Sequence, residues 1–207
     1  MGFTRAELKN DAKKALAGKW GLSVGVTLIY MLLSAIASQV PIIGLIAIFL
    51  CMPALIMGLT LFFLKISRNE DVGIETLFQW FPKLFKAFGL NFMIQLFIFL
   101  WSLLLIIPGI IASIRYSMAY YIMLDNPEIG IMDAIRESKR ITNGRKMDIF
   151  ILCLSFIGWA LLATLTLGIG YLWLVPYMQT TYANLYNRLK DAPAVDGVGV
   201  DNAVPVE

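Results

Sequence analysis

Long apolar stretches that carry almost no charge constrain this chain more than any other feature. They cover residues 21–38, 42–64, 89–107, 110–124 and 149–165, and a last stretch that follows the Gly168–Gly170 turn and reaches Tyr186. Stretches of this length and composition are typical of helices that cross a bilayer. The sequence therefore predicts an all-α polytopic membrane protein with about six transmembrane helices.

Composition supports the same class. Of the 207 residues, 59% are hydrophobic and only 15% are charged, and the mean hydropathy is +0.75. Soluble domains carry about a quarter charged residues, so a bilayer explains this apolar surface better than a water-soluble core does. We expect one membrane domain over residues 1–190. The acidic segment 191–207, rich in Gly, Pro and Val, is predicted to be a disordered cytoplasmic tail.

The basic residues are distributed unevenly along the chain. Every lysine and arginine except Arg115 lies before the first stretch, between the second and third, between the fourth and fifth, or after the sixth. The turns near Pro41, Pro108 and Gly168 have none. The positive-inside rule then places both termini in the cytoplasm of a multi-pass plasma-membrane protein. The small residues at 34–38 could suggest a signal peptide, but the long charged segment before them favours a retained helix.

The helices are predicted to form three antiparallel hairpins, at residues 21–64, 89–124 and 149–186. A basic, partly amphipathic segment precedes each one, at residues 4–19, 74–88 and 129–141. Thr4 and Glu7 are spaced as a capping box at the start of the first segment. Either an internal repeat or six spans with short outer turns explains this pattern.

Arg115 is the one charge predicted to lie within the membrane. An arginine there costs about 2.5–3.5 kcal/mol on insertion scales and is a functional candidate. All 14 acidic residues map to cytoplasmic segments, so no carboxylate is expected beside it. The alternatives are snorkelling, internal hydrogen bonding, or contact with an anionic ligand such as a lipid phosphate.

Other polar side chains lie at similar predicted depths. Tyr116 shares a helix face with Arg115, and Gln95, Gln179 and Thr180 lie on other predicted spans. These five residues are candidate ligand contacts lining a polar cavity. The alternative is that polar and small residues join helices within lipid without any ligand.

Aromatic and basic residues also mark the expected membrane interfaces. Trp20, Trp80, Lys83 and Lys86 are predicted at the cytoplasmic interface, beside anionic headgroups, and Trp173 is predicted at the outer one. They either fix the depth of the hairpins or recognise a specific lipid or protein.

The residues that enzymes and metal sites need are scarce. The chain has no histidine, and Cys51 and Cys153 lie far apart in apolar stretches. We expect no catalytic residue, metal, cofactor or nucleic-acid partner. The favoured function is non-catalytic binding or organisation of lipid or another amphiphile. The alternatives are an accessory partner of a transporter or envelope enzyme, including a homo-oligomer, and, less favoured, a passive carrier or channel.

Several motifs resemble those of a bacterial integral membrane family. They are Gly18-Lys19-Trp20, the run from Leu103 to Ile111 with Pro108-Gly109, Asp125-Asn126-Pro127, the run from Leu154 to Trp159, and Pro176-Tyr177. With them the chain resembles the family called domain of unknown function 975 over nearly its whole length except the tail. The resemblance implies a multi-span membrane fold, but no established activity and no functional residues.

Overall fold

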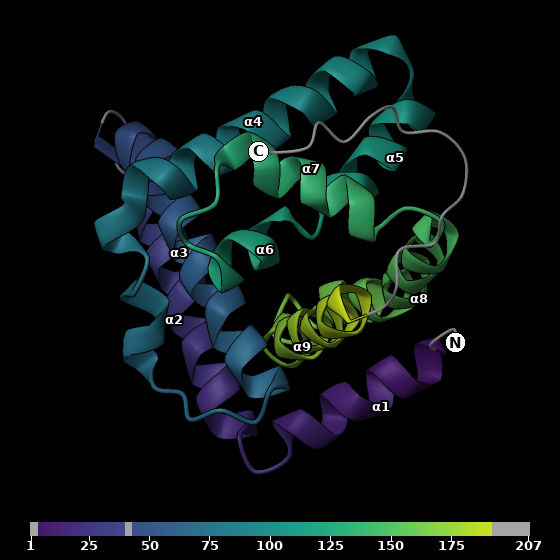
Figure 1. Ribbon diagram of the computed structural model, residues 1–207. Coiled ribbons are helices and arrows are strands. Elements are labelled where there is room, and N and C mark those ends of the chain that lie inside the picture. The colour runs from purple at the N-terminus through teal and green to yellow at the C-terminus, as the bar shows by residue number, and fades with distance from the viewer. Residues whose placement is uncertain (1–3, 40–42, 192–207) are drawn as a thin grey trace.

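The computed structural model describes residues 4–39 and 43–191, and every regular element in these ranges is a helix (Figure 1). The all-α prediction is confirmed. The α-helices are α1 (Arg5–Leu16), α2 (Trp20–Gln39), α3 (Ile43–Ser67), α4 (Leu84–Leu104), α5 (Ile106–Tyr116), α6 (Ala119–Asp125), α7 (Ile131–Ile141), α8 (Lys146–Leu165) and α9 (Tyr171–Lys190). The short 3₁₀-helices η1 (Ile74–Phe78) and η2 (Phe81–Lys83) precede α4. The predicted turn at Pro41 and the tail from residue 192 lie outside the described ranges.

Five stretches are long and apolar enough to cross a membrane. They are Trp20–Ala37, Phe49–Ser67, Ile74–Leu104, Ile106–Asp125 and Lys146–Leu165. The helix α9 is not among them, although it covers the sixth predicted stretch. It packs against α1, α2, α3 and α8, and a helix surrounded by protein can carry polar residues that a lipid-facing helix cannot. The sixth span stays a prediction.

The fourth predicted helix, residues 110–124, is divided in the structure. The helix α5 ends at Tyr116 and α6 begins at Ala119. Between them, the Ser117 hydroxyl donates a hydrogen bond to the carbonyl of Ile114, at 2.8 Å, and the Ser117 amide donates to the same oxygen. Residues 117–118 form a turn, so the prediction of one continuous helix was wrong, although Ile106–Asp125 is still one candidate span.

The turn predicted at Pro108-Gly109 lies earlier in the chain. Leu105 is extended, with φ −163° and ψ 152°, and separates α4 from α5. Pro108 lies in the first turn of α5, where its missing N–H leaves no intrahelical hydrogen bond unmade. The proline therefore helps to begin a helix here and does not end one.

The three basic segments adopt different structures. In the first, α1 begins with the predicted capping box: the Thr4 hydroxyl accepts from the Glu7 amide at 3.2 Å, and the Glu7 carboxylate accepts from the Thr4 amide at 3.0 Å. The second forms η1, η2 and the start of α4, and the third forms α7. Pro82 lies inside η2, which explains why residues 74–88 do not form one amphipathic helix.

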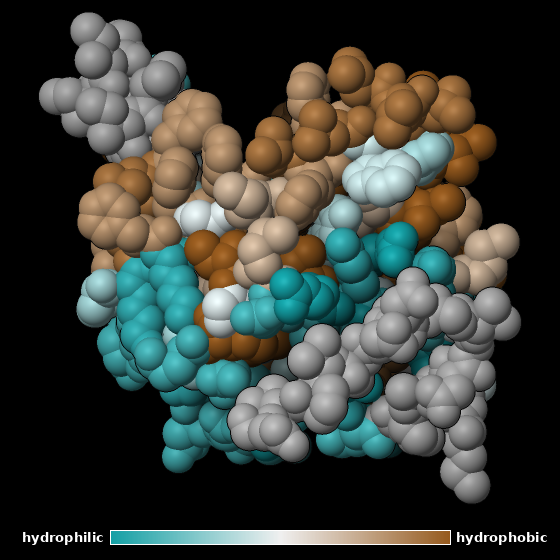
Figure 2. Space-filling model, turned by 45° about the horizontal axis from the view of Figure 1, so that its top comes forward, coloured by the Kyte–Doolittle hydropathy of each residue, from teal (hydrophilic) through white to brown (hydrophobic). Residues whose placement is uncertain are grey.

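Hydrogen bonds join these polar segments to one another across long sequence separations. The Lys19 ammonium donates to the Glu70 carbonyl at 2.8 Å, and the Lys83 ammonium donates to the Glu128 carboxylate at 2.8 Å. We call the polar face the surface formed by the three basic segments together with the helix ends at Arg68, Asp125 and Lys190. Figure 2 shows hydrophilic residues gathered over one half of the visible surface and hydrophobic residues over the other. This separation suits a protein that lies partly in lipid and partly at its boundary.

Candidate functional site

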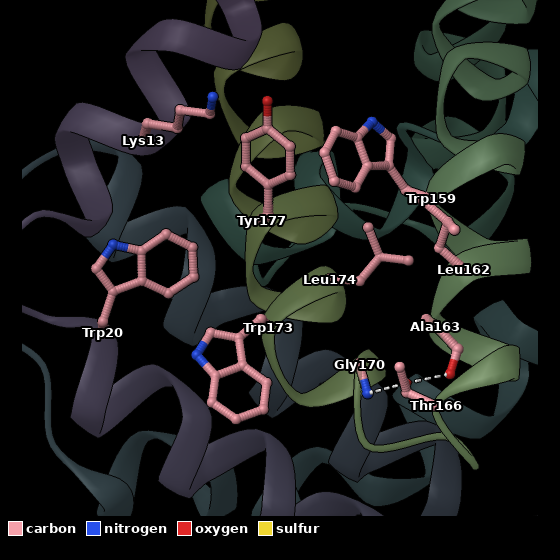
Figure 3. A pocket seen from close by; sticks show the side chains of 10 residues that line it. All are labelled: Lys13, Trp20, Trp159, Leu162, Ala163, Thr166, Gly170, Trp173, Leu174 and Tyr177. Carbon is pink, nitrogen blue, oxygen red and sulfur yellow. Dashed lines mark hydrogen bonds between the residues drawn. The ribbon is translucent and has the colours of Figure 1, made fainter.

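An open cavity of 520 Å³ lies between the first two and the last two α-helices of the described chain (Figure 3). Its lining comes from α1, α2, α8 and α9: Lys13, Trp20, Trp159, Leu162, Ala163, Thr166, Gly170, Trp173, Leu174 and Tyr177. We call it the aromatic cleft. Three of the five tryptophans in the chain contribute to it.

The helix α1 forms one wall of the aromatic cleft because it packs along α9. Its apolar side chains Leu8, Ala12 and Leu16 are fully buried. Arg188 of α9 also donates to the carboxylates of Asp11, at 2.5 Å, and Glu7, at 3.3 Å. Apolar burial and charge therefore hold the two helices together.

Lys13 is the single charged residue in the lining. Its ammonium lies 5.8 Å from the ring centroid of Tyr177, within the range of a cation–π contact. In Figure 3 the Lys13 ammonium and the Tyr177 hydroxyl point to the same end of the cleft. Within residues 4–39 and 43–191, Lys13 makes no salt bridge. The cleft is therefore apolar along its length and cationic at one end.

The turn between α8 and α9 closes the opposite end. The Thr166 hydroxyl donates to the Ala163 carbonyl at 2.8 Å and accepts from the Gly170 amide at 3.0 Å. A Cβ atom on Gly170 would lie 2.8 Å from the Cα atom of Ala163. Glycine thus allows the two helices to approach closely at this end.

The lining favours a particular chemistry. Indole, phenol and aliphatic side chains offer a large apolar surface to a hydrocarbon chain. A lysine ammonium at one end offers a charge-assisted hydrogen bond to a carboxylate or phosphate. Together they suit a molecule with an apolar body and an acidic head. Among the described residues, no cluster of His, Cys, Asp or Glu could hold a metal ion.

The five predicted ligand contacts do not line this cleft. Tyr116 is buried beside Phe97, with ring centroids 5.9 Å apart, and Gln95 is exposed on α4. Thr180 is buried on α9, and its hydroxyl has no hydrogen-bond partner among the described residues. The helix α5 packs mainly on α4, whereas α9 packs mainly on α1 and α3, and α8 touches both α5 and α9. The predicted residues are thus divided between two parts of the bundle.

The residues predicted at the membrane interfaces have three different surroundings. Trp20 and Trp173, which the sequence assigned to opposite interfaces, line the same aromatic cleft. Trp80 is 5% exposed and packs in the core, so it is not a surface anchor. Lys83 and Lys86 border a separate cavity of 310 Å³, where the Lys86 ammonium donates to the Pro127 carbonyl at 2.6 Å.

Sequence reasoning missed Lys13, Trp159 and Tyr177 as site residues. One signal was present: Trp159 and Tyr177 lie in two of the motifs that resemble the family, at residues 154–159 and 176–177. Lys13 carries no such signal, because it is one of several lysines on α1 and only its contact with α9 distinguishes it.

The protein is all-helical within the described residues, has five apolar helical stretches long enough to cross a membrane, and contains the aromatic cleft. Comparison with protein families then identifies the group. The chain matches the model "Protein of unknown function (DUF975)" over residues 1–112 and 103–193, and it belongs to that family. No curated protein and no solved structure matches it.

Proposed function

We propose that this chain is a non-catalytic integral membrane protein that binds one amphiphile, a lipid or a similar molecule with an acidic head, in the aromatic cleft. The observation that carries the proposal is the lining: three tryptophans and a tyrosine around an apolar cavity that has one cation, Lys13, at its end.

The surroundings of the cleft fit a ligand that enters from lipid. Trp159, Leu162 and Trp173 line the cavity and also expose more than half of their surface. Such a wall is continuous with the apolar outer surface of α8, where Leu161 and Leu165 are exposed. A hydrocarbon chain can therefore pass between bilayer and cleft without crossing water.

The topology that accompanies this proposal has six spans, with both termini in the cytoplasm of a plasma-membrane protein. Its support is the polar face, where the segment after α3 meets the ends of α6 and α9 through Arg68, Asp125 and Lys190. Segments that share one face lie on one side of a bilayer, and their lysines and arginines favour the cytoplasmic side.

Native mass spectrometry of the protein, purified in a mild non-ionic detergent, tests the ligand. We expect one retained amphiphile per chain, with occupancy reduced about tenfold in Trp159→Ala and Lys13→Gln, since each removes a contact of about 1–2 kcal/mol. Trp101→Ala is the matched control, because Trp101 is an exposed tryptophan on α4 outside the cleft.

Two results would count against this function. One is a preparation that retains no amphiphile. The other is retention that all three variants reduce equally, because that indicates nonspecific lipid around the protein. Purification with a defined protein partner and no lipid would favour an accessory role in a membrane assembly instead.

A further inference from the structure

A second cationic site lies away from the aromatic cleft, where α5 meets α7. Arg115 is in the last turn of α5, and the Ser138 hydroxyl of α7 donates to its carbonyl at 2.7 Å. Ser138 is fully buried. This bond fixes the end of α5 against α7 and brings Arg115 next to Lys139.

Neither of these two cations has a counter-charge within the described part of the chain. The Arg115 Nε atom is buried and has no hydrogen-bond partner there, and neither residue forms a salt bridge there. The Lys139 ammonium lies over the ring of Tyr116, 5.4 Å from its centroid. Burial, Arg115 and Arg136 together lower the pKa of Lys139.

The acidic residues of α7 are already paired with other cations. Asp133 accepts from Arg136 at 2.9 Å, and Glu137 accepts from Arg140 at 2.7 and 2.5 Å. Both pairs join residues three apart on α7. These carboxylates are thus directed at Arg136 and Arg140, and the positive charge of Arg115 and Lys139 is left uncompensated.

From this arrangement we propose that Arg115 and Lys139 bind a phosphate group between α5 and α7. A guanidinium donates from a planar fork and an ammonium from a point charge, and the two together suit a tetrahedral oxyanion. An anion here would give the buried Arg115 Nε the acceptor that it lacks. It would also remove the repulsion between the two cations.

The phosphate has two possible chemical sources, a lipid headgroup and a free phosphate ion. The preceding turns of α5 expose Ile106, Ile107, Ile110 and Ile111, which suits acyl chains alongside the helix. A free phosphate ion would contact only the two cations and would not use this apolar surface. The experiment separates the two sources.

The test uses the full chain, stripped of lipid in a non-ionic detergent. Titrations with phosphatidylglycerol, phosphatidylcholine and inorganic phosphate are followed by calorimetry. We expect Arg115→Gln and Lys139→Gln each to weaken the binding of phosphatidylglycerol or inorganic phosphate, whichever binds, about fivefold, since one cation contributes about that factor. Arg136→Gln, which removes an exposed cation of the same helix, should change it less than about twofold.

The pattern of ligands then decides the outcome. If phosphatidylglycerol binds, the two substitutions weaken that binding, and inorganic phosphate does not bind, the site belongs to an anionic lipid. If inorganic phosphate binds, the site belongs to a free ion. Both results support the site. Binding that is absent, or that Arg136→Gln weakens as much as the other two, would overturn it. Lys139→Gln guards against misfolding of the Arg115 variant, because Lys139 is only partly buried and forms no salt bridge within the described residues.

Discussion

Arg68, the first residue after α3, donates two parallel hydrogen bonds to the carboxylate of Asp125, the last residue of α6. The Nη1–Oδ1 distance is 2.7 Å and the Nη2–Oδ2 distance is 2.9 Å. The Tyr186 hydroxyl and the Lys190 ammonium of α9 donate to the same carboxylate at 2.9 and 2.7 Å. Asp125 raises the pKa of Arg68. One carboxylate therefore joins α3, α6 and α9 at the polar face.

Replacing that carboxylate should destabilise the protein. We expect Asp125→Asn to lower the free energy of unfolding by about 1–3 kcal/mol, since it leaves Arg68 and Lys190 without their shared counter-charge. Chemical unfolding in detergent micelles measures the effect. Glu128→Gln is the control, because the Glu128 side chain is 86% exposed in its pair with Lys83, and exposed pairs contribute about 0–1 kcal/mol. Equal losses in the two variants would contradict the central role of Asp125.

A close backbone contact holds η1 against α3. A Cβ atom on Gly58 would overlap the Leu77 carbonyl, whereas one on Gly25 of α2 would meet no atom of the described residues within 4 Å. We expect Gly58→Ala to destabilise the protein by about 1–3 kcal/mol, because the neighbouring atoms are backbone and must move. Gly25→Ala should be neutral or slightly stabilising. The thermal midpoints of the two variants in one detergent provide the comparison, and a Gly58→Ala midpoint at or above that of Gly25→Ala would refute the contact.

Single cysteines can show whether α9 crosses the membrane. In a background without Cys51 and Cys153, we expect Leu167→Cys and Asp191→Cys to react with an impermeant thiol reagent from opposite sides. Leu167 is 94% exposed in the turn before α9, and Asp191 follows its last residue. Asp71→Cys should behave like Asp191→Cys. Labelling of positions 167 and 191 from the same side would show that α9 does not cross the membrane.

Apolar length and capping chemistry correctly predicted the all-α class, the presence of span-length apolar helices and the start of α1. The apolar stretches and the capping box of Thr4 and Glu7 are local features, so the sequence contains the information needed to recognise them. The break between α5 and α6 lies inside one apolar stretch, and hydropathy does not report it. The early turn at Leu105 was missed because proline was taken as the end of a helix when it lies in a first turn.

The candidate site was harder to predict, because it depends on which helices meet. Arg115 was recognised as an unusual charge, but its neighbour Lys139 comes from α7 and is separated from it along the chain. Trp20 and Trp173 were predicted to lie at the membrane interfaces from their places near helix ends. Only the packing of α1 along α9 brings them into one cleft with Lys13. Tertiary contacts of this kind leave no periodic signal in the sequence.

Tryptophan fluorescence tests amphiphile binding in the aromatic cleft most directly. One variant has Trp80 and Trp101 replaced by phenylalanine and so keeps the three cleft tryptophans, and a second variant keeps only Trp101. The measurement is quenching by a brominated fatty acid added to the detergent-solubilised protein. We predict that the cleft tryptophans are quenched to saturation at one fatty acid per chain, and that Trp101 is quenched only in proportion to the brominated fraction of the micelle. Equal, non-saturating quenching of both variants would contradict the account.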